Sequence, residues 1–542
     1  MKEEKQDQKM EEEMMQQLRS KATELLLREE WIESIKLYSH YLSLCQEQLL
    51  IFHEMSGTEQ VSKLHKSLCL AFSNRAEART RLGYLSDALE DCDRALEIEP
   101  THSKTLLCKG KILLVLNRYS MASDCFKRVA SVELQIGGNC ETVHEYLDRC
   151  KKLEFQSRTG VLDLSEWVLS GFRGKPPELA EYIGAIQIKK SEHSGRGLFA
   201  TKDIEAGTLL LVTKAVATGR GILPKPGEDS SDSARLVMWK DLVDKVLDAA
   251  SKCSKTHHLI RNLSRGEDED GLEIPVISFF KPDGTDESLF SKEKPNVGSI
   301  VNILDVNSLT EDAISAKVLG KNSDYYGVGL WILASFINHS CNPNARRLHI
   351  GDHVVIHASR DVKAGEEITS AYFDVLVPLN KRREMSKTWG FHCRCRRCKF
   401  EEEINCRGEI REFEAAAERG LDMGAVVVGL EENMRRWMVK GKEKGYLRAS
   451  FWAAFSGAFR SDKSMRRWGI RIPAMEAVVE SVAEAVGADE RILRVVVEGL
   501  KRNGGGGIVQ MERALKLGRG VYGRVLKKQA MKAFLELSRI HD

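Results

Sequence analysis

The chain has 542 residues, and its 82 lysines and arginines against 79 aspartates and glutamates leave a formal net charge of +3. This length suits about three to four domains. The near balance of charge gives no reason to expect direct nucleic-acid binding, which depends on a basic excess. With 42% hydrophobic residues, the composition is typical of a folded globular protein and excludes a wholly disordered or fibrous chain.

Residues 1–17 are crowded with charged side chains before any apolar run, so they do not resemble a secretory signal. No window approaches the ~18 uninterrupted apolar residues of a membrane helix. We therefore expect an intracellular protein, cytoplasmic or nuclear or both, without membrane contact. Thirteen cysteines is an odd number. In a reducing compartment, the close cluster Cys393, Cys395 and Cys398 predicts metal ligands rather than disulfides.

Two segments 34 residues apart resemble each other, at residues 83–89 and 117–123, and they place Ala88 and Ala122 in equivalent positions. Thirty-four residues is the tetratricopeptide period. Residues 30–38 match the same pattern, with Ser34 in the equivalent place and 54 − 34 = 20 additional residues before the next unit. The pattern predicts three helix pairs over residues 15–150. An ordinary helical bundle is the alternative.

From residue 183 onward the apolar period changes to that of short strands separated by Gly-rich turns. Strands are predicted at residues 186–188, 208–212, 346–350, 353–358 and 367–372, with Gly351 and Asp352 as a hairpin turn. Residues 219–324 interrupt this pattern and contain one clear amphipathic helix, at residues 236–250. After residue 401 the sequence is predicted to be helical, and its tryptophans are more typical of core packing than of a ligand cage.

Four short motifs follow one another along the second half of the chain. They are Gly-Arg-Gly-Leu-Phe-Ala at residues 195–200, Asn-His-Ser-Cys-Asn-Pro-Asn at 338–344, Gly-Glu-Glu-Ile-Thr-Ser-Ala-Tyr at 365–372, and Cys-Arg-Cys-Arg-Arg-Cys at 393–398. The first motif alone is more often a flexible turn than a cofactor loop. Together, the set resembles the SET-domain protein lysine methyltransferases. The long interruption and the cysteine tail resemble their SET and MYND branch, in a plant-type combination with tetratricopeptide repeats.

The resemblance implies S-adenosylmethionine as cofactor. Glycines at 195 and 197 permit close approach to such a ligand, and the Asn338 side chain offers both an acceptor and donors. A competing interpretation of Asn338 is a cap that ends a helix over residues 330–337. The cofactor contacts that the resemblance implies are Arg196, Gly197, Asn307, Asn338, His339 and Phe391.

The resemblance also assigns the catalytic role to Tyr372, whose hydroxyl would orient a neutral lysine amine against the methyl group without adding a charge. A core position in a strand is the alternative for this residue. Phe391 resembles the aromatic residue that packs against adenine. Trp389 departs from the family, which usually has tyrosine there, and this departure puts cofactor affinity and activity in question.

Tetrahedral zinc takes four ligands, and Cys393, Cys395 and Cys398 supply three. The resemblance implies Cys341, in the Asn-His-Ser-Cys motif, as the fourth. Cys406 is the competing ligand on sequence proximity. The separate zinc finger of the SET and MYND branch needs about seven cysteines and a histidine, and residues 219–324 contain only Cys253 and two histidines. That finger is therefore expected to be absent.

Tetratricopeptide repeats that grip chaperone C-termini use a clamp of Lys, Asn, Asn, Lys and Arg around a carboxylate. Here Arg19, Asn74 and Lys104 match clamp positions, Arg19 in charge only, while Thr23 and Cys108 replace the second and fifth members. The sequence predicts a weakened clamp for a peptide or chaperone partner at most. Solvated groove residues are an equal alternative.

These observations predict a multidomain α+β protein with helical repeats (15–150), a β-rich SET domain (183–378) with a helical insert (about 219–324), a zinc-binding post-SET segment (379–403) and a C-terminal helical region (404–542). The predicted function is an S-adenosylmethionine-dependent lysine N-methyltransferase whose substrate is a protein lysine. An adaptor with a catalytically weak SET fold, binding protein partners such as chaperones, is the alternative.

Overall fold

The structure is a computed structural model. It describes residues 2–54, 58–136, 141–170, 175–192, 194–222, 230–266, 272–282, 290, 293–311, 325–420, 422–502 and 508–537. The chain forms two compact units. The first comprises residues 1–158, 246–261 and 278–300, and the second comprises 159–245, 262–277 and 301–542. Among the described residues, no helix combines the length and apolar character needed to cross a membrane.

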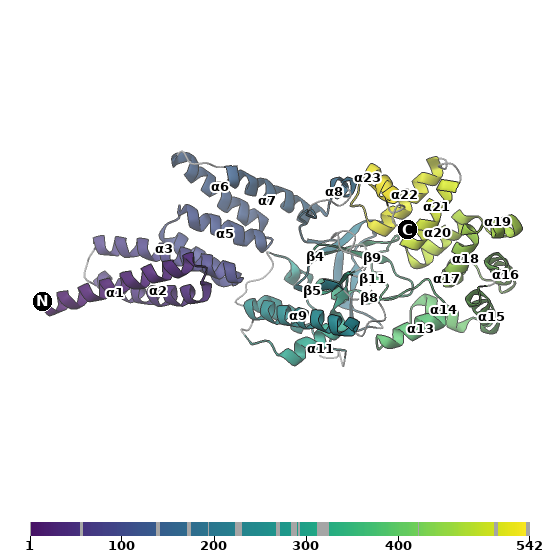
Figure 1. Cartoon of the computed structure of the whole chain (residues 1–542), viewed down its shortest axis with the longest axis horizontal. Coiled ribbons are helices and arrows are strands. Elements are labelled where there is room, and N and C mark those ends of the chain that lie inside the picture. The colour runs from purple at the N-terminus through teal and green to yellow at the C-terminus, as the bar shows by residue number, and fades with distance from the viewer. Residues whose placement is uncertain are drawn as a thin grey trace. The chain divides into compact units, whose positions relative to one another are not determined.

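The first unit begins with a series of paired helices, drawn from purple to blue in Figure 1. They are α1 (Lys2–Leu27), α2 (Trp31–Glu54), α3 (Thr58–Leu82), α4 (Leu85–Ile98), α5 (Ser103–Val115), α6 (Tyr119–Ile136) and α7 (Glu141–Thr159). The predicted helix pairs are confirmed. Ser34, Ala88 and Ala122 are all fully buried, because their small side chains let neighbouring helices approach closely.

The 20 additional residues of the first connection are absorbed mainly by longer helices. Helices α2 and α3 have 24 and 25 residues, whereas α4 and α5 have 14 and 13. Helix α4 ends at Ile98, two residues before Pro100, whose ring and missing N–H oppose continuation.

The second unit holds the strands. They are β1 (Tyr182–Ile183), β2 (Ile186–Lys190), β3 (Arg196–Ala200), β4 (Leu209–Lys214), β5 (Ala217–Ile222), β6 (Leu309–Thr310), β7 (Tyr325–Leu330), β8 (Asn338–His339), β9 (Ala345–Ile350), β10 (His353–Ala358) and β11 (Glu367–Ser370). Within the described residues these strands form three sheets, with orders β1-β4-β10-β9, β2-β3-β11-β8 and β5-β7-β6. The predicted hairpin turn is confirmed, since His353 pairs with Ile350 across Gly351 and Asp352.

Strands β3, β5 and β7 were not predicted, and glycine explains why. Gly195 has φ +65° and forms the turn, whereas Gly197 lies inside β3. In β5, a Cβ on Gly219 would lie 2.2 Å from the Met238 carbonyl oxygen. Glycine therefore lets the helix α9 (Ser230–Lys252), which covers the predicted 236–250, pack directly against β5. Such strands lack the alternating apolar side chains that identify a strand in a sequence.

The remaining elements of the long interruption are α10 (Ser254–Arg261), the 3-10 turn η2 (Ile277–Phe280) and α11 (Val297–Asn307). Another 3-10 turn, η4 (Leu333–Phe336), precedes β8. Asn338 therefore lies in a strand and does not follow a helix over 330–337. The capping interpretation of Asn338 is wrong, because the chain is already extended at Ile337 (φ −91°, ψ 106°).

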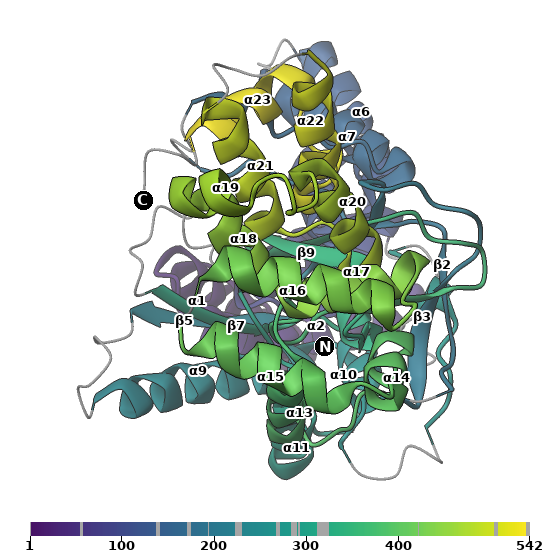
Figure 2. The ribbon, with the colours of Figure 1, turned by 90° about the vertical axis from the view of Figure 1, so that its right-hand side faces the viewer.

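The C-terminal part of the second unit is helical, as predicted. Its helices are α13 (Leu379–Thr388), α14 (Arg396–Glu403), α15 (Arg407–Glu418), α16 (Met423–Arg436), α17 (Gly441–Ser450), α18 (Trp452–Arg460), α19 (Asp462–Trp468), α20 (Met475–Val486), α21 (Glu490–Arg502), α22 (Ile508–Tyr522) and α23 (Lys528–Leu537). Figure 2 shows these green-to-yellow helices face on. Helix α23 packs against α8 (Ser165–Leu169).

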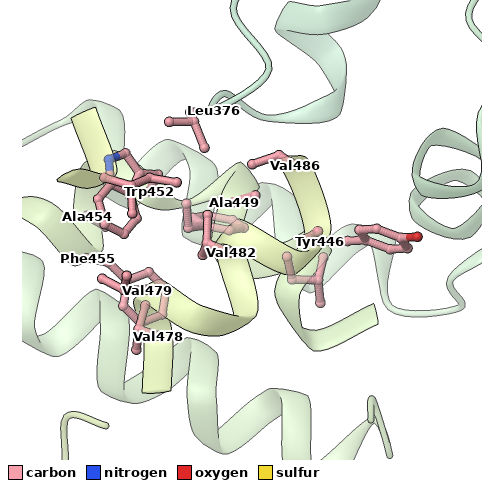
Figure 3. Close-up of a cluster of buried hydrophobic side chains, with 14 of the residues drawn as sticks. Leu376, Tyr446, Ala449, Trp452, Ala454, Phe455, Val478, Val479, Val482 and Val486 are labelled. Carbon is pink, nitrogen blue, oxygen red and sulfur yellow. The ribbon is translucent and has the colours of Figure 1, made fainter. Parts of the chain in front are cut away.

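One hydrophobic cluster joins these helices to the cysteine tail. Tyr446, Trp452 and Phe455 belong to it together with the valines of α20, and Leu376 joins it from the segment after β11 (Figure 3). Cys341 and Cys398 belong to the same cluster. The helical region is therefore continuous with the core beneath the cysteines.

The sheet β1-β4-β10-β9 meets the C-terminal helices with very little space between backbones. A Cβ on Gly487 would lie 2.2 Å from Ser359 Oγ, and one on Gly520 would lie 3.0 Å from the Ser359 carbonyl oxygen. The buried ring of His357 lies 3.2 and 3.1 Å, through Nε2, from the carbonyl oxygens of Gly520 and Val521. Because a carbonyl oxygen only accepts, Nε2 carries the proton.

Candidate active site

Three of the four motifs meet on neighbouring strands of one sheet. In β3, Phe199 pairs with Glu367 of β11. On the other edge of β11, Thr369 pairs in parallel with Asn338 of β8. Residues that are more than 140 positions apart in sequence are thus placed side by side, and the segment carrying Tyr372 follows directly from β11.

Asn338 is held by two hydrogen bonds from its amide nitrogen. Nδ2 donates to the Arg196 carbonyl oxygen at 3.0 Å and to Glu367 Oε1 at 2.7 Å. A primary amide has two N–H groups, and both are used here. The polar atom that remains for a ligand is the amide oxygen Oδ1.

Gly197 lies against this pair. A Cβ at position 197 would lie 2.4 Å from Glu367 Oε1 and 3.0 Å from Asn338 Nδ2. The sequence attributed Gly197 to close approach of a cofactor. In the structure, the close neighbours of Gly197 are the side chains of Glu367 and Asn338, so this glycine makes room for that hydrogen bond.

The side chain of Arg196 points into the insert. Its NH1 donates to the Glu273 carbonyl oxygen at 2.9 Å, and its guanidinium lies 5.3 Å from the centre of the Phe336 ring. Arg196 contributes to the site through its backbone carbonyl, which accepts from Asn338. The buried side chain packs beneath the site.

Asn307 has the same arrangement as Asn338. Its Nδ2 donates to the Ser264 and Ile303 carbonyl oxygens, each at 2.7 Å, and its backbone carbonyl accepts from Ser335 Oγ at 3.2 Å. The residue is buried at the end of α11. Both asparagines that the resemblance selected therefore have their N–H groups bonded to protein oxygens.

His339 links the motifs to the cysteine tail. Its Nδ1 accepts from the Tyr372 backbone N–H at 3.1 Å, so Nε2 carries the proton, and Nε2 lies 3.3 Å from Cys341 Sγ. Its ring stacks on Phe373, with centroids 4.2 Å apart. Phe391 lies 5.3 Å from the same ring. The Tyr372 backbone contact thus fixes the tautomer of His339, and the ring lies between that backbone and the sulfur atom of Cys341.

Tyr372 lies at a pocket with Asn307, Ser335, Arg347 and Trp389 among its lining residues. The Tyr372 hydroxyl donates to the Ile337 carbonyl oxygen at 2.7 Å. Burial raises the pKa of Tyr372 to about 12, so the hydroxyl stays neutral near pH 7. The alternative of a core position in a strand is wrong, because β11 ends at Ser370 and Tyr372 is only partly buried, in the lining of this pocket.

Two aromatic residues from the tail frame Tyr372. The Trp389 ring lies 5.2 Å from the Tyr372 ring, and the Phe391 ring lies 6.1 Å away at 88°. Trp389 ends α13 and is about half exposed. The tail thereby supplies the outer aromatic wall of the pocket.

The sulfur atoms of Cys341, Cys393, Cys395 and Cys398 all lie within 4.8 Å of one another. Three of these cysteines are buried, and Cys395 is partly so. Hydrogen bonding from Cys393, followed by Cys395 and Cys398, lowers the pKa of Cys341 well below the usual thiol value. Four thiol ligands at this spacing fit a tetrahedral zinc ion. Cys406, the competing ligand, precedes α15 and is not a member of this group.

A buried ion cluster connects the cysteine tail to the C-terminal helices. Glu401 accepts from Arg382 NH2 at 2.5 Å and from Arg397 Nε at 2.8 Å. Arg382 also donates to Cys398 Sγ at 3.2 Å, and Arg397 donates to the Cys341 carbonyl oxygen at 3.1 Å. Ser450 on α17 donates to Glu401 at 3.0 Å. Sequence reasoning missed this cluster, because its members appear as ordinary charged residues between the cysteines.

In the first unit, three of the five predicted clamp positions, Thr23, Asn74 and Lys104, are joined by hydrogen bonds that include Tyr38. Tyr38 OH lies 2.8 Å from Thr23 Oγ1 and accepts from Asn74 Nδ2 at 2.9 Å. Lys104 Nζ donates to Asn74 Oδ1 and pairs with Glu77, each at 2.9 Å. Tyr38, which sequence reasoning missed, thus takes one N–H group of Asn74, and Lys104 bonds to the amide oxygen.

The other two clamp positions lie apart from this chain of hydrogen bonds. Arg19 NH1 donates to Ser67 Oγ at 3.4 Å, and Cys108 Sγ lies 3.8 Å from Thr80 Oγ1. All five positions are therefore engaged by neighbouring side chains, Cys108 through sulfur contacts to Thr80 and Cys92.

Residues 195–373 match the family model described as SET domain. The chain therefore contains a SET domain, and the relationship to SET-domain methyltransferases that the motifs predicted is confirmed. Over 392 residues the chain is 23% identical to a protein of Gibberella zeae described as "Methyltransferase", covering 68% of this chain and 49% of that protein. Over 77 residues it is 39% identical to human "Histone-lysine N-methyltransferase SMYD3", covering 14% of this chain and 18% of that protein.

The chain thus spans at most about half the length of these relatives. Among solved structures, it is similar to the Sgt2 TPR domain from Aspergillus fumigatus, with 20% identity and a TM-score of 0.20, over 32% of this chain and 92% of that one.

Proposed function

We propose that the chain is an S-adenosylmethionine-dependent protein lysine N-methyltransferase acting on histone or non-histone lysines. The observation that supports this most directly is the meeting of β3, β11 and β8, which brings Asn338 and the segment carrying Tyr372 to one edge of a sheet. The SET-domain match over the same residues and relatives described as methyltransferases support the same class of reaction.

The groups around β8 suit a methyl donor that carries an ammonium and an adenine. Asn338 and Asn307 present amide oxygens, because their N–H groups are already bonded to the protein. Phe391 offers an aromatic face 5.3 Å from His339. When bound, S-adenosylmethionine supplies an electrophilic methyl group on a sulfonium. The contribution of these residues would be to fix its orientation.

On the lysine side, the amine must be neutral and aligned before it can attack a methyl group. The Tyr372 hydroxyl is neutral, and its hydrogen bond to the Ile337 carbonyl holds it in one direction. Its oxygen can therefore accept from the amine without adding a charge. Trp389, which lines the same pocket beside Tyr372, would cover the alkyl chain of the substrate lysine.

We propose that Cys341, Cys393, Cys395 and Cys398 hold a structural Zn²⁺. The ion would have a structural role and would take no part in the chemical step. The ion would connect the β8 motif to the tail, and the tail in turn presents Phe391 and Trp389 to the pocket. A cluster of thiols that binds metal also needs a reducing compartment, which supports an intracellular location, cytoplasmic or nuclear.

For the first unit we propose weak binding of a peptide or chaperone C-terminus. Asn74 and Lys104 face the clamp position but already bond to Tyr38 and Glu77. A bound carboxylate would share these two side chains with Tyr38 and Glu77, since an amide nitrogen has two N–H groups and an ammonium has three. The alternative function, an adaptor with a catalytically weak SET fold, is motivated by Trp389 and by the helical repeats. The Trp389 indole lies 5.2 Å from the Tyr372 ring, in the lining of the pocket.

Incubation of the zinc-loaded full-length protein with labelled S-adenosylmethionine and a cell extract tests the proposal. Label on lysine is expected from the wild type and should be lost in Tyr372→Phe. Calorimetry with S-adenosylmethionine separates the two functions. Cofactor binding without lysine-linked label would reject the enzymatic claim, and the absence of any binding would favour the adaptor.

A further inference from the structure

Glu367 lies between the strands that carry the other motifs and bonds to both sides. Its Oε1 accepts from Asn338 Nδ2 at 2.7 Å, and its Oε2 accepts from Ser191 Oγ at 3.0 Å. Ser191 is buried, and the glycine at 197 leaves the space in which Glu367 reaches Asn338. The carboxylate is thus held at both oxygen atoms beside the asparagine.

These contacts determine the direction of the Asn338 amide. A carboxylate oxygen and a backbone carbonyl only accept hydrogen bonds, so the group that faces both must be the NH₂ end of the amide. The carbonyl end Oδ1 then points away from Glu367 and Arg196. Rotating the amide by 180° would place its oxygen against two other acceptors, which is unfavourable at these distances.

We propose that Glu367 is a positioning residue that sets which end of the Asn338 amide faces the methyl donor, so that the site selects a ligand with an ammonium group at that point. This inference rests on the proposed function. An ammonium only donates hydrogen bonds, and it therefore needs Oδ1. If the amide turned, its NH₂ would face the ammonium, and two donors would oppose each other.

The experiment uses two probes that differ by one group: S-adenosylhomocysteine and its des-amino analogue, in which hydrogen replaces the α-amino group. Their affinities for the zinc-loaded full-length protein are measured by calorimetry, in the wild type, Glu367→Ala and Glu367→Gln. In Glu367→Ala the affinity for S-adenosylhomocysteine should fall at least about tenfold, or about 1.4 kcal/mol. Affinity for the des-amino analogue should change less than about threefold.

Glu367→Gln is the conservative variant. The glutamine oxygen can still accept from Asn338 Nδ2 while its own NH₂ donates to Ser191 Oγ. We expect it to retain S-adenosylhomocysteine affinity within about threefold of the wild type. Glu366→Gln is the matched control, because Glu366 bonds to Asn344 and Arg360 and not to Asn338. It should leave the ratio of the two affinities unchanged.

Three other outcomes would overturn the inference about Glu367. Equal losses for both probes in Glu367→Ala would show a general structural role. A loss in Glu367→Gln as large as that in Glu367→Ala would show that the charge itself, and not the direction of the amide, attracts the ammonium. Wild-type affinity in both variants would remove Glu367 from the site. If the wild type binds neither probe, the proposed function fails instead.

A separate observation in the first unit concerns a second set of metal-binding side chains. Cys69 on α3, Glu99 after α4 and His102 before α5 have ligand atoms that all lie within 4.8 Å of one another. Cys69 Sγ lies 3.8 Å from Glu99 Oε2. Cys69 is buried and Glu99 is exposed, so the group is closed on one side and open to water on the other.

The histidine of this group is oriented by a further contact, since His102 Nδ1 lies 2.6 Å from the hydroxyl of buried Thr105. Hydrogen bonds of this kind commonly fix histidines that bind metals. Thiolate, imidazole and carboxylate are all ligands that zinc accepts. We infer that these three residues form a second zinc site, separate from the four cysteines, with water as its fourth ligand.

Zinc per chain, measured after equilibration of the full-length protein with micromolar zinc, tests this inference. Two ions are expected in the wild type, and one in both Cys69→Ala and His102→Ala. His102 is partly exposed, so its replacement leaves the core intact. Cys45→Ala, which removes another buried thiol of the same core, should still hold two. One ion in the wild type, or two in His102→Ala, would overturn the site.

Discussion

Replacing Glu401 by glutamine should destabilise the second unit strongly. Arg382 and Arg397 have side chains that are 1% and 0% exposed, and both bond to the Glu401 carboxylate. Glutamine keeps the shape but removes the charge, and its NH₂ end must face one of two guanidinium groups. Breaking a buried ion pair by removing one partner typically costs about 3–5 kcal/mol.

Two hydrogen bonds that Arg397 keeps after the substitution decide where in that range the loss of unfolding free energy falls. Arg397 keeps its bonds to the Val375 carbonyl and to Ser450, so the lower half of the range, about 3–4 kcal/mol, is expected. The second unit has about 345 residues, and an unfolding entropy of about 2.1 cal/mol/K per residue gives a decrease of about 1.4 °C in melting temperature for each kcal/mol. The transition of the second unit should therefore shift down by roughly 4–6 °C.

Differential scanning calorimetry of the zinc-loaded full-length protein measures the shift. Glu403→Gln is the control, because Glu403 lies exposed on the same helix α14. It makes the same chemical change without a buried partner and should alter the melting temperature by less than about 2 °C. If Glu401→Gln melts within that margin of Glu403→Gln, the buried cluster is not a source of stability and the reasoning is refuted.

Four further predictions concern the site and its support. Tyr372→Phe should reduce lysine methylation by ~10²-fold while calorimetry finds cofactor affinity unchanged; wild-type turnover would exclude the hydroxyl from the mechanism. Cys341→Ser should lower the zinc content by one ion per chain and Cys406→Ser should not, as measured by metal analysis; the reverse result would place the fourth ligand in the tail. Gly197→Ala should weaken S-adenosylhomocysteine binding by about 1–3 kcal/mol, because its Cβ would displace Glu367; unchanged calorimetric affinity would contradict the close contact. Burial, with a smaller effect of Arg346, lowers the pKa of His357 to about 4 from an ordinary value of 6.5. The unfolded state therefore binds more protons between these values, so the free energy of unfolding is highest above about pH 6.5 and falls as the pH drops toward 4. Denaturant titrations across this range should show that slope, and His357→Gln should flatten it.

The helical repeats could be predicted because their signal is local. Ala88 and Ala122 recur at a fixed period, and Pro100 marks a helix end. The strands β9, β10 and β11 were also visible, since each is a short segment with apolar residues next to a Gly-containing turn. Strand β3 was not, because Gly197 removes the alternation for a reason that lies elsewhere in the chain, the side chain of Glu367.

The candidate site shows the same division. The motif around Asn338 could be recognised, but the direction of its amide could not, because that direction depends on Arg196 and Glu367 from two other strands. Arg196 was expected as a cofactor contact, and in the structure its backbone carbonyl accepts a hydrogen bond from Asn338 while its side chain bonds to the Glu273 carbonyl. Tyr38 was missed entirely, since nothing in a repeat pattern says that its hydroxyl will reach Asn74. Contacts between segments that are distant in sequence cannot be predicted from the local pattern of any one segment.

The contact at Ser359 bears on how such a protein can change over generations. A domain that recombines freely between proteins needs a surface whose packing and hydrogen bonds do not depend on one particular neighbouring domain. Here Ser359 fits against Gly487 and Gly520 with no room for a single added carbon at either glycine, and the His357 ring donates to a backbone carbonyl of the same helices. Recombination that joined this sheet to a different helical partner would leave a buried imidazole unpaired and backbones in collision. The sheet and the helices that follow it must therefore be inherited together, although only the first is recognised by the family pattern.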